Sequence, residues 1–450
     1  MTPNNVLLVT IDSLRADHLP SFGNETVDAN AIEGMMREGD SFRWAFTTGP
    51  GTTPSFPAML TGTMPLSYGG LGPLRDDRPR LARELGKNGL ATAGYHCNPF
   101  LSSYFNYELG FDQFEDYQNV LMGIATKIFP RGIELNNPML RNIDEKLHLT
   151  DAIKTAYQIV AGKPRPYVRA EVITDDTVEW LQQLSTPFFC WTHYMDVHHP
   201  CYPPSEYRER YEVADVSQTE VSQMYSTLLT EPGSLSSEDL RILERLYDAA
   251  IEYVSDQLAR ILQTLRQTGV LDETLVIVTS DHGEMFGEFE QFGKPERMHD
   301  ELLHVPLVVL NGPEYLGDAT EDLVSLLDIP PLIHDALGLE IPKAYTGRCP
   351  GLDESRSYVL AEHQVEGDVV VGARSADWLY EVDEIHDERR LFTMHDGERK
   401  RMNTEGNDSG ANLVKTAVSA RIEDLDGVTG VSPVSLDEDV EQRLEDLGYR

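Results

Sequence analysis

The sequence predicts an α/β fold in which a mostly parallel β-sheet is flanked by helices, with a small α+β subdomain at the C-terminal end. Two observations lead to this prediction. Continuous apolar runs rich in β-branched residues occur along the chain, as is typical of parallel strands buried on both faces. Helical patterns lie between these runs, and strands that alternate with helices form a parallel sheet covered on both sides.

Four strand-like runs are expected to form this sheet, at 6–11, 187–192, 275–279 and 305–310. The first and the third are the clearest, because they read Val-Leu-Leu-Val-Thr-Ile and Leu-Val-Ile-Val-Thr. A long helix is predicted from Ser237 to Thr268, where apolar residues recur at helical spacing and Gly269 ends the pattern.

The chain divides into two predicted parts. Residues 1–348 form the large domain, which includes a helical insertion at about 117–170, where short apolar pieces are broken by turn signals. Residues 349–450 form the small subdomain, because the pattern changes there to short alternating strands. These strands are expected at 358–362, 368–374 and 378–382. A charged, loop-like stretch is expected next, followed by a final helix near 437–447.

The outstanding bulk property is a formal net charge of −38, from 75 acidic and 37 basic residues, of which only nine are lysine. A folded protein with such a surface is suited to high salt, where self-repulsion is screened. Disorder is the competing interpretation, but a hydrophobic fraction of 40% with 19 Tyr and 15 Phe argues against it. The composition therefore indicates a halophilic protein. Its charge makes nucleic acid or an anionic membrane an unfavourable partner over most of the surface.

No targeting or membrane-spanning segment is expected. The chain passes from Met1 into a strand-like run without a basic region, an apolar region or a cleavage site. No stretch approaches the roughly 20 apolar residues of a membrane span. The cysteines, Cys97, Cys190, Cys201 and Cys349, are scattered without CxxC spacing, so neither a disulfide framework nor a structural zinc site is indicated. The expectation is a soluble protein of the cytoplasm.

Acidic side chains follow two of the expected strands. Asp12 follows the first, and Asp281 and His282 follow the run at 275–279. An aspartate at a strand end is, taken alone, more often a helix cap or a turn former. However, ligands of open α/β sheets gather at the carboxyl ends of strands, and carboxylates with an imidazole and a hydroxyl suit a divalent cation. The pair of strand ends therefore predicts a metal site.

Three histidines and an aspartate lie within seven residues just beyond the strand at 187–192, namely His193, Asp196, His198 and His199. Each histidine alone is more often a surface or packing residue. Together they are too polar for a core segment, and an unperturbed pKa of about 6.5 suits imidazoles to proton transfer or metal binding. Their place at a strand end favours a functional site.

The segment Gly51–Gly62 supplies a candidate nucleophile. It places Thr52 on a turn just before a helix-like apolar run, where unpaired backbone N–H groups and the helix dipole favour developing negative charge. The alternative interpretation is that Thr52 or Thr53 merely caps the helix, with Pro54 in its first turn.

Taken together, these segments resemble the sulfatase family of the alkaline phosphatase superfamily from end to end. The family has an Asp after its first strand, as at Asp12, and a nucleophile motif C/S-x-P-S-R-x-x-x-L-T-G, which lies over Thr52–Gly62. A PH-x-P-like element is matched by His198-His199-Pro200, and the strand that ends in Asp-His is matched by Asp281-His282. Lesser matches lie at 110–114, 247–251, 303–307 and 444–449. The resemblance implies an alkaline-phosphatase-like fold, with 1–348 as the catalytic domain.

Three departures from the family pattern bear on the chemistry. Threonine stands at position 52, where sulfatases have Cys or Ser that is oxidised to formylglycine, so no formylglycine is expected there. Phe56 replaces the arginine of the motif, and Ser13 follows Asp12 where many sulfatases have a second aspartate. The remaining set looks like that of the phosphonate and phosphodiester hydrolase branch.

The resemblance implies roles for individual residues. One divalent metal ion, Mn, Zn, Ca or Mg, would be held by Asp12, Thr52, Asp281 and His282, with Thr52 as the nucleophile. His198 would protonate the leaving oxygen. Lys294 would neutralise the transferred group, although a solvated surface lysine is an equal alternative. Asn98 and His193 are weaker candidates for the pocket. His299 is not expected to contact the metal or the transferred group.

Three functions follow in order of preference. The first is a metal-dependent, sulfatase-like hydrolase that cleaves sulfuric or phosphoric esters of a small molecule or a glycan through the threonine. The second is a phosphodiester or phosphonate monoester hydrolase, or a phosphoryl-group transferase. The third is a non-catalytic binding protein on a sulfatase scaffold. The sequence leaves the oligomeric state open.

Overall fold

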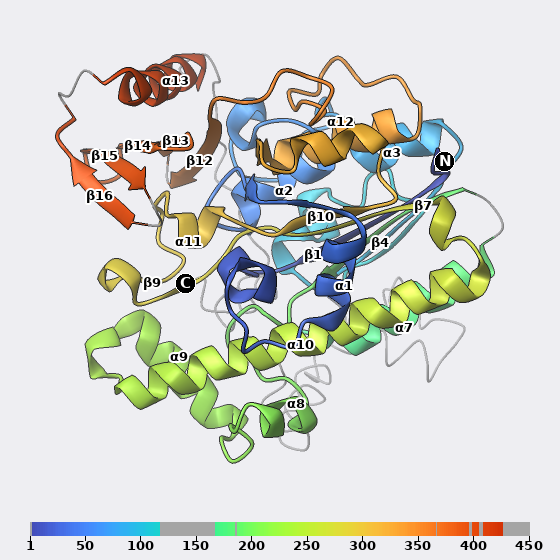
Figure 1. The fold of residues 1–450 in the computed structure, drawn as a ribbon, viewed down its shortest axis with the longest axis horizontal. Coiled ribbons are helices and arrows are strands. Elements are labelled where there is room, and N and C mark those ends of the chain that lie inside the picture. Colours follow the sequence, from blue (N-terminus) through green and yellow to red (C-terminus); the bar gives the residue numbers. More distant parts are fainter. Residues whose placement is uncertain are drawn as a thin grey trace, which may run out of the picture.

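The computed structural model describes residues 2–117, 167–184, 187–365, 367–395, 398–404 and 408–425. Figure 1 shows a central sheet with helices on both faces and a second, smaller sheet beside it. Most of the predicted insertion at 117–170, and the whole of the predicted final helix at 437–447, lie outside the described residues. The short match to the sulfatase pattern at 444–449 lies outside them as well.

The central sheet has seven strands in the order β2-β10-β7-β1-β6-β4-β5. Strand β10 runs in the direction opposite to the other six strands, so the sheet is mostly parallel, as predicted. The four predicted strands are confirmed as β1, β6, β7 and β10. The seven strands span β1 Asn5–Ile11, β2 Asp40–Phe42, β4 Ala91–Tyr95, β5 Gln113–Glu115, β6 Phe188–Tyr194, β7 Thr274–Ser280 and β10 Leu307–Leu310.

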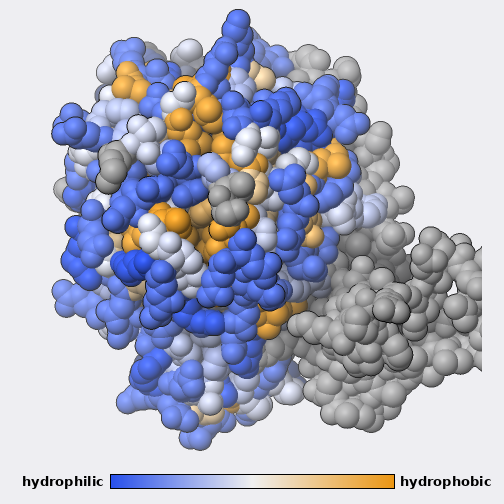
Figure 2. Space-filling model, turned by 90° about the vertical axis from the view of Figure 1, so that its right-hand side faces the viewer, coloured by the Kyte–Doolittle hydropathy of each residue, from blue (hydrophilic) through white to orange (hydrophobic). Residues whose placement is uncertain are grey.

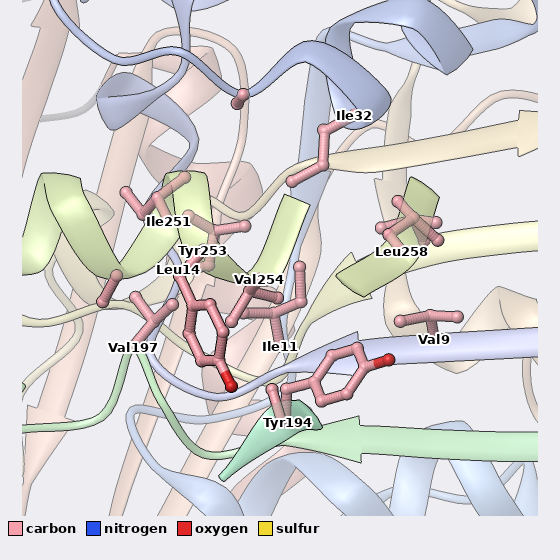
Figure 3. Packing of buried hydrophobic residues seen from close by; sticks show 14 of the residues in the cluster. Val9, Ile11, Leu14, Ile32, Tyr194, Val197, Ile251, Tyr253, Val254 and Leu258 are labelled. Atoms are coloured by element: carbon pink, nitrogen blue, oxygen red, sulfur yellow. The ribbon is translucent and has the colours of Figure 1, made fainter. Parts of the chain in front are cut away.

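One face of the sheet packs against α10, which spans Ser237–Thr268 and confirms the predicted helix. Ser236 and Asp239 form a capping box at its start, and Gly269 ends it in a left-handed conformation with φ 75°. Helices α1 (Asn30–Glu38) and α7 (Ala170–Gln183) lie beside it. Figure 3 shows the resulting core, where residues of β1 and β6 meet apolar side chains of α10.

The opposite face packs against α2 (Thr52–Thr61), α3 (Leu81–Lys87) and α12 (Ile329–Ala336). Because side chains alternate along a strand, β1 supplies apolar residues to both layers: Leu7, Val9 and Ile11 to the α10 side, Val6 and Leu8 to the α2 side. This burial on both faces explains the continuous apolar run in the sequence.

The C-terminal part is a five-stranded antiparallel sheet in sequential order, with α13 (Ser409–Leu425) packed on β13 and β14. Its strands span β12 Val359–Val365, β13 Asp368–Arg374, β14 Trp378–Asp383, β15 Glu388–His395 and β16 Glu398–Met402. The first three were predicted. The expectation of a charged loop after them is wrong, because β15 and β16 lie there. Charged residues interrupt the apolar alternation in these two strands, and one of them, Arg390, lies opposite Glu381 of β14.

The four cysteines are buried free thiols, as expected. Among the described helices, none is both long and apolar enough to cross a membrane. Figure 2 shows that one face of the molecule is mostly hydrophilic, with scattered apolar patches. The division between residues 348 and 349 stays a prediction.

Candidate active site

Two neighbouring strands bring the predicted acidic residues together. Strands β1 and β7 are parallel, with Ile11 opposite Ser280, so Asp12 and Asp281 leave the sheet side by side. Ser13 links them: its Oγ donates a hydrogen bond to Asp12 Oδ1 at 2.8 Å, and its backbone N–H donates to Asp281 Oδ1 at 3.2 Å. Both carboxylates are completely buried. A pair of this kind is costly to bury unless a positive charge lies between the two acids.

His282 completes a group that could hold a metal ion. Its Nδ1 donates to the carbonyl of Gly283 at 2.8 Å, so the neutral ring presents an unprotonated Nε2. That Nε2 lies 3.4 Å from Asp281 Oδ2 and 3.6 Å from Asp12 Oδ1. One ligand atom from each of Asp12, Asp281 and His282 falls within 4.8 Å of the others. Two carboxylate oxygens and an oriented imidazole nitrogen fit a divalent transition metal.

Thr52 lies against this group. It is the first residue of α2, and its Oγ1 is 3.0 Å from Asp281 Oδ2 and 3.3 Å from His282 Nε2. The alternative that Thr52 or Thr53 caps the helix is wrong, because Gly51 is the N-cap residue and no side chain caps α2. The threonine hydroxyl therefore points at the candidate metal ligands from the positive end of a helix.

The two weaker sequence candidates both contact Asp12. Asn98 Nδ2 donates to Asp12 Oδ2 at 2.9 Å and lies 3.4 Å from Thr52 Oγ1. His193 Nε2 lies 3.3 Å from the same carboxylate oxygen, while its Nδ1 faces the hydroxyl of Thr10 at 2.9 Å. Asn98 follows β4 and His193 is part of β6, so four parallel strands contribute to one site.

Phe56 shows what replaces the arginine of the sulfatase motif. Its side chain is completely buried and contacts His193 edge-on, with ring centroids 5.0 Å apart. It also packs against Trp191 at 5.4 Å. An aromatic ring, and not a cation, therefore packs against His193, which contacts Asp12.

Lys294 lies at the site and is not a solvated surface lysine. Its side chain is 12% exposed, and its Nζ lies 3.9 Å from Asp12 Oδ1 and 3.7 Å from Glu284 Oε2. Glu284 is completely buried and accepts a hydrogen bond from the Tyr225 hydroxyl at 3.2 Å. The lysine ammonium is therefore held between two carboxylates.

His198 is buried beside the same charges. Its Nδ1 donates to the carbonyl of His199 at 2.6 Å, which leaves Nε2 as the proton acceptor of the neutral ring. Burial, together with the positive charge of Lys294, lowers the pKa of His198 to about 3. His199 packs elsewhere, stacked on Tyr225 with ring centroids 4.8 Å apart.

The two aspartates differ in acidity. Burial opposes the ionisation of Asp12, but His198, His193 and Lys294 hold its pKa well below the usual range. Burial and the negative charge of Asp12 raise the pKa of Asp281 well above its usual range. A bound divalent cation would favour the ionised form of both.

Two features of the site were not expected from the sequence: Glu284 and the bridging role of Ser13. Glu284 stands between Asp281-His282-Gly283 and the apolar pair Met285-Phe286, and this position could have indicated a carboxylate at the site. Ser13 was noted only as the absence of a second aspartate. Its φ of 62° is rare outside glycine and turns its backbone N–H towards Asp281.

Gly283 occupies a position where only a hydrogen atom fits. A Cβ atom would lie 2.0 Å from the carbonyl oxygen of Glu301 and 2.8 Å from Arg15 Cγ. We expect Gly283→Ala to lower the free energy of unfolding by about 2 kcal/mol, because overpacking would displace the turn that carries Asp281. Chemical denaturation measures this, with Gly233→Ala as the control, since no atom lies within 4 Å of a Cβ built there. Equal losses in both variants would contradict the prediction.

Comparison with known proteins shows which family the chain resembles. A family model described as Sulfatase matches residues 4–339. The arylsulfatase of Clostridium perfringens is 24% identical over 395 residues, which cover 80% of this chain and 81% of that protein.

Solved structures share the fold over nearly the whole chain. The phosphonate monoester hydrolase from Silicibacter pomeroyi matches with a TM-score of 0.69 and 22% identity, covering 96% of this chain and 97% of that one. BT4656, solved in complex with its substrate D-glucosamine-2-N,6-O-disulfate, matches with a TM-score of 0.68 and 15% identity, covering 95% and 98%.

Proposed function

The chain belongs to the sulfatase family, whose members are ester hydrolases, and from that premise we propose that it cleaves sulfuric or phosphoric esters through the hydroxyl of Thr52. The observation that carries this proposal is the position of Thr52 Oγ1, 3.0 Å from Asp281 Oδ2 and 3.3 Å from His282 Nε2 at a helix N-terminus.

Asp12, Asp281 and His282, with Thr52, would hold one divalent metal ion. When bound, such an ion supplies a Lewis acid that polarises the ester oxygens and lowers the pKa of a nearby hydroxyl. The imidazole favours Mn²⁺ or Zn²⁺ over Ca²⁺. Asn98 and His193 orient Asp12 by contacting its Oδ2.

The Thr52 hydroxyl is oriented by its hydrogen bond to Asp281 Oδ2 and releases its proton to solvent. The oxygen then forms a bond to sulfur or phosphorus as the bond to the leaving oxygen breaks. His198 donates the proton that the leaving oxygen takes up. Because its imidazole is neutral in the free protein, that proton is acquired with the anionic ester, whose charge stabilises the imidazolium. Lys294 compensates charge on the transferred group.

The threonine determines how the cycle ends. A threonine sulfate or phosphate ester has no aldehyde hydrate through which to collapse, so water or an acceptor alcohol must open it. Water gives hydrolysis, and an alcohol gives group transfer. This favours phosphoryl chemistry and keeps a phosphodiester or phosphonate monoester hydrolase, or a phosphoryl-group transferase, as the second candidate. The third candidate, a non-catalytic binding protein, is supported by Phe56, because an aromatic residue stands there in place of the arginine of the motif.

One experiment tests the proposal. Metal-reconstituted protein is assayed in high salt against an aryl sulfate, a phosphate monoester, a phosphodiester and a phosphonate ester, with a glycan sulfate as a fifth substrate. We expect turnover of at least one ester, abolished by a chelator. Peptide mass spectrometry should find unmodified threonine at position 52, or its sulfate or phosphate ester after rapid quenching. A protein that binds metal but turns over none of the esters would point to the binding-protein alternative.

The charge of −38 leads to a further prediction, that the protein is halophilic and works in a salt-rich cytoplasm. Because the Debye length falls from about 10 Å at 0.1 M salt to about 3 Å at 1 M, added KCl should screen the repulsion between surface carboxylates. We expect Tm to rise by several degrees between 0.1 M and 3 M KCl. Replacing five exposed carboxylates by their amides should flatten this rise. A Tm that is constant or falls with KCl would contradict halophily.

A further inference from the structure

A buried cluster of charged side chains joins the catalytic part of the chain to the C-terminal sheet. It contains Arg297 and His299, from the loop after Lys294, and Glu381, Asp383, Arg390 and Arg399, from β14, β15 and β16. Figure 1 shows β9 (Phe292–Gly293), α11 (Asp300–Leu303) and β16 on the same side of the molecule.

Two of the three arginines are matched by carboxylates. Arg297 contacts Asp383 and lies 3.5 Å from Glu381 Oε1, and Arg390 contacts Glu381 and lies 3.9 Å from Asp383 Oδ2. Glu381 also accepts the backbone N–H of Met298 at 2.7 Å. A third carboxylate, Glu388 Oε2, lies 3.5 Å from Arg297 Nη2 and 3.9 Å from Arg390 Nε. Within the described residues, these ion pairs all involve Arg297 or Arg390 and none involves Arg399.

Arg399 is the unmatched cation. In the described part of the chain it forms no ion pair; its Nη1 contacts the imidazole Nδ1 of His299. Its guanidinium lies over the Phe392 ring at 3.8 Å and over the Phe289 ring at 5.1 Å. Asp300, the nearest acid in sequence to His299, is paired with Arg374 at 3.0 Å. An unmatched arginine is notable in a chain of net charge −38.

Three donors in this cluster have no acceptor among the described residues: Arg390 Nε, Arg399 Nε and His299 Nε2. Arginine can only donate, so His299 Nδ1 accepts from Arg399 and the ring proton must be on Nε2. Buried donors without acceptors are costly and rare in folded proteins. His299 is 3% exposed and Arg390 8%. Because every unsatisfied group is a donor, the missing partner is a hydrogen-bond acceptor.

The cluster lies near the reaction. The hairpin of β8 (Met285–Phe286) and β9 leads from Glu284 to Lys294, and its connection carries Phe289, which is stacked on His299 with ring centroids 5.2 Å apart. Phe289 is 52% exposed, so solvent reaches this wall of the cluster. Four residues lie between Lys294 and His299, so five Cα-to-Cα steps join them and their Cα atoms lie at most about 18 Å apart.

We propose that Arg399, His299 and Arg390 form a second anion-binding site, which takes an oxyanion such as sulfate or carboxylate. The planar guanidinium and the imidazole N–H supply charge-assisted hydrogen bonds of the kind that bind such groups. The upper limit of about 18 Å between the Cα atoms of Lys294 and His299 is compatible with a further anionic group on a short sulfated or carboxylated glycan whose ester lies at Thr52. That substrate assignment rests on the proposed function; the same chemistry would bind a free inorganic anion.

The site is tested first without catalysis. Crystals of the wild-type protein are soaked in sodium selenate, and the anomalous signal of selenium locates the anion. We expect a peak within hydrogen-bonding distance of Arg399 and His299, absent in Arg399→Gln crystals. A water molecule alone at this position, with selenate bound elsewhere, overturns the proposal. This result stands even if the protein cleaves no ester.

The source of the anion is tested by kinetics on 4-nitrophenyl sulfate and on glucosamine-2-N,6-O-disulfate. We expect Arg399→Gln to raise KM for the disulfate about 10-fold and to leave the aryl sulfate unchanged, because one charge-assisted contact is lost. Arg389→Gln, an exposed arginine of β15, removes the same charge as the control. If selenate binds at the site but Arg399→Gln changes KM equally for the two substrates, the site binds a free anion and not a group of the substrate. Tm of each variant shows that it is folded.

Discussion

Thr52→Ala is expected to abolish ester cleavage, with a loss in kcat of about 10⁴-fold or more. The reason is that the proposed bond-forming oxygen is removed, and water would have to reach the same position without the support of α2. The fold should survive, since Thr52 is the first residue of its helix and its side chain does not cap it. Measuring the metal content together with kcat would show whether activity is lost because the nucleophile is absent or because the metal no longer binds.

Thr52→Ser is the matched control, because it keeps the hydroxyl that lies 3.0 Å from Asp281 Oδ2. It should retain activity within about 10-fold of the wild type, with metal content unchanged. If Thr52→Ala and Thr52→Ser lose activity equally, the methyl group and not the oxygen is what matters, and the nucleophile must be sought elsewhere. If neither loses activity, the proposed mechanism is wrong.

The sequence predicted the parts of the fold that depend on local patterns. Strands buried on both faces appear as uninterrupted apolar runs, and α10 has both a capping box and a terminal glycine. For the same reason Asp12 and Asp281 were recognisable: each follows such a run, and adjacent parallel strands end at the same edge. Predicting these two aspartates required only the position of each one relative to the strand that precedes it.

The rest depended on contacts that no local pattern records. The residues of β15 and β16 are mostly charged, and the burial of one of them, Arg390, follows from its partner Glu381 on another strand. Glu284 gains its position from Tyr225, which is 59 residues away on a different element. Likewise, Lys294 could be separated from a surface lysine only by the two carboxylates that flank it.

Asp281→Asn is expected to remove metal binding, and with it activity, while leaving the metal-free protein folded. The amide fits the same hydrogen bonds: its oxygen accepts the backbone N–H groups of Ser13 and His282, and its nitrogen faces Thr52 Oγ1. The variant lacks the second negative charge that a divalent cation needs. Metal content after dialysis and kcat should both fall to background.

Measurements of stability distinguish the loss of metal binding in Asp281→Asn from a general destabilisation of the fold. A ligand that binds only the folded state stabilises it by about 2.7 kcal/mol at 100 times its Kd, so Tm of the wild type should rise with added Mn²⁺ or Zn²⁺ while that of Asp281→Asn should not.

Without metal, the variant and not the wild type should have the higher stability. Burial and Asp12 raise the pKa of Asp281, so folding favours its protonated form, and the metal-free wild type loses stability as pH rises above the ordinary aspartate range. Asparagine does not titrate, so the metal-free variant should be the more stable protein at pH 7 and less sensitive to pH. A metal-free variant less stable than the metal-free wild type at pH 7 would mean that Asp281 is a structural hydrogen-bonding group and not a metal ligand held at a cost to stability.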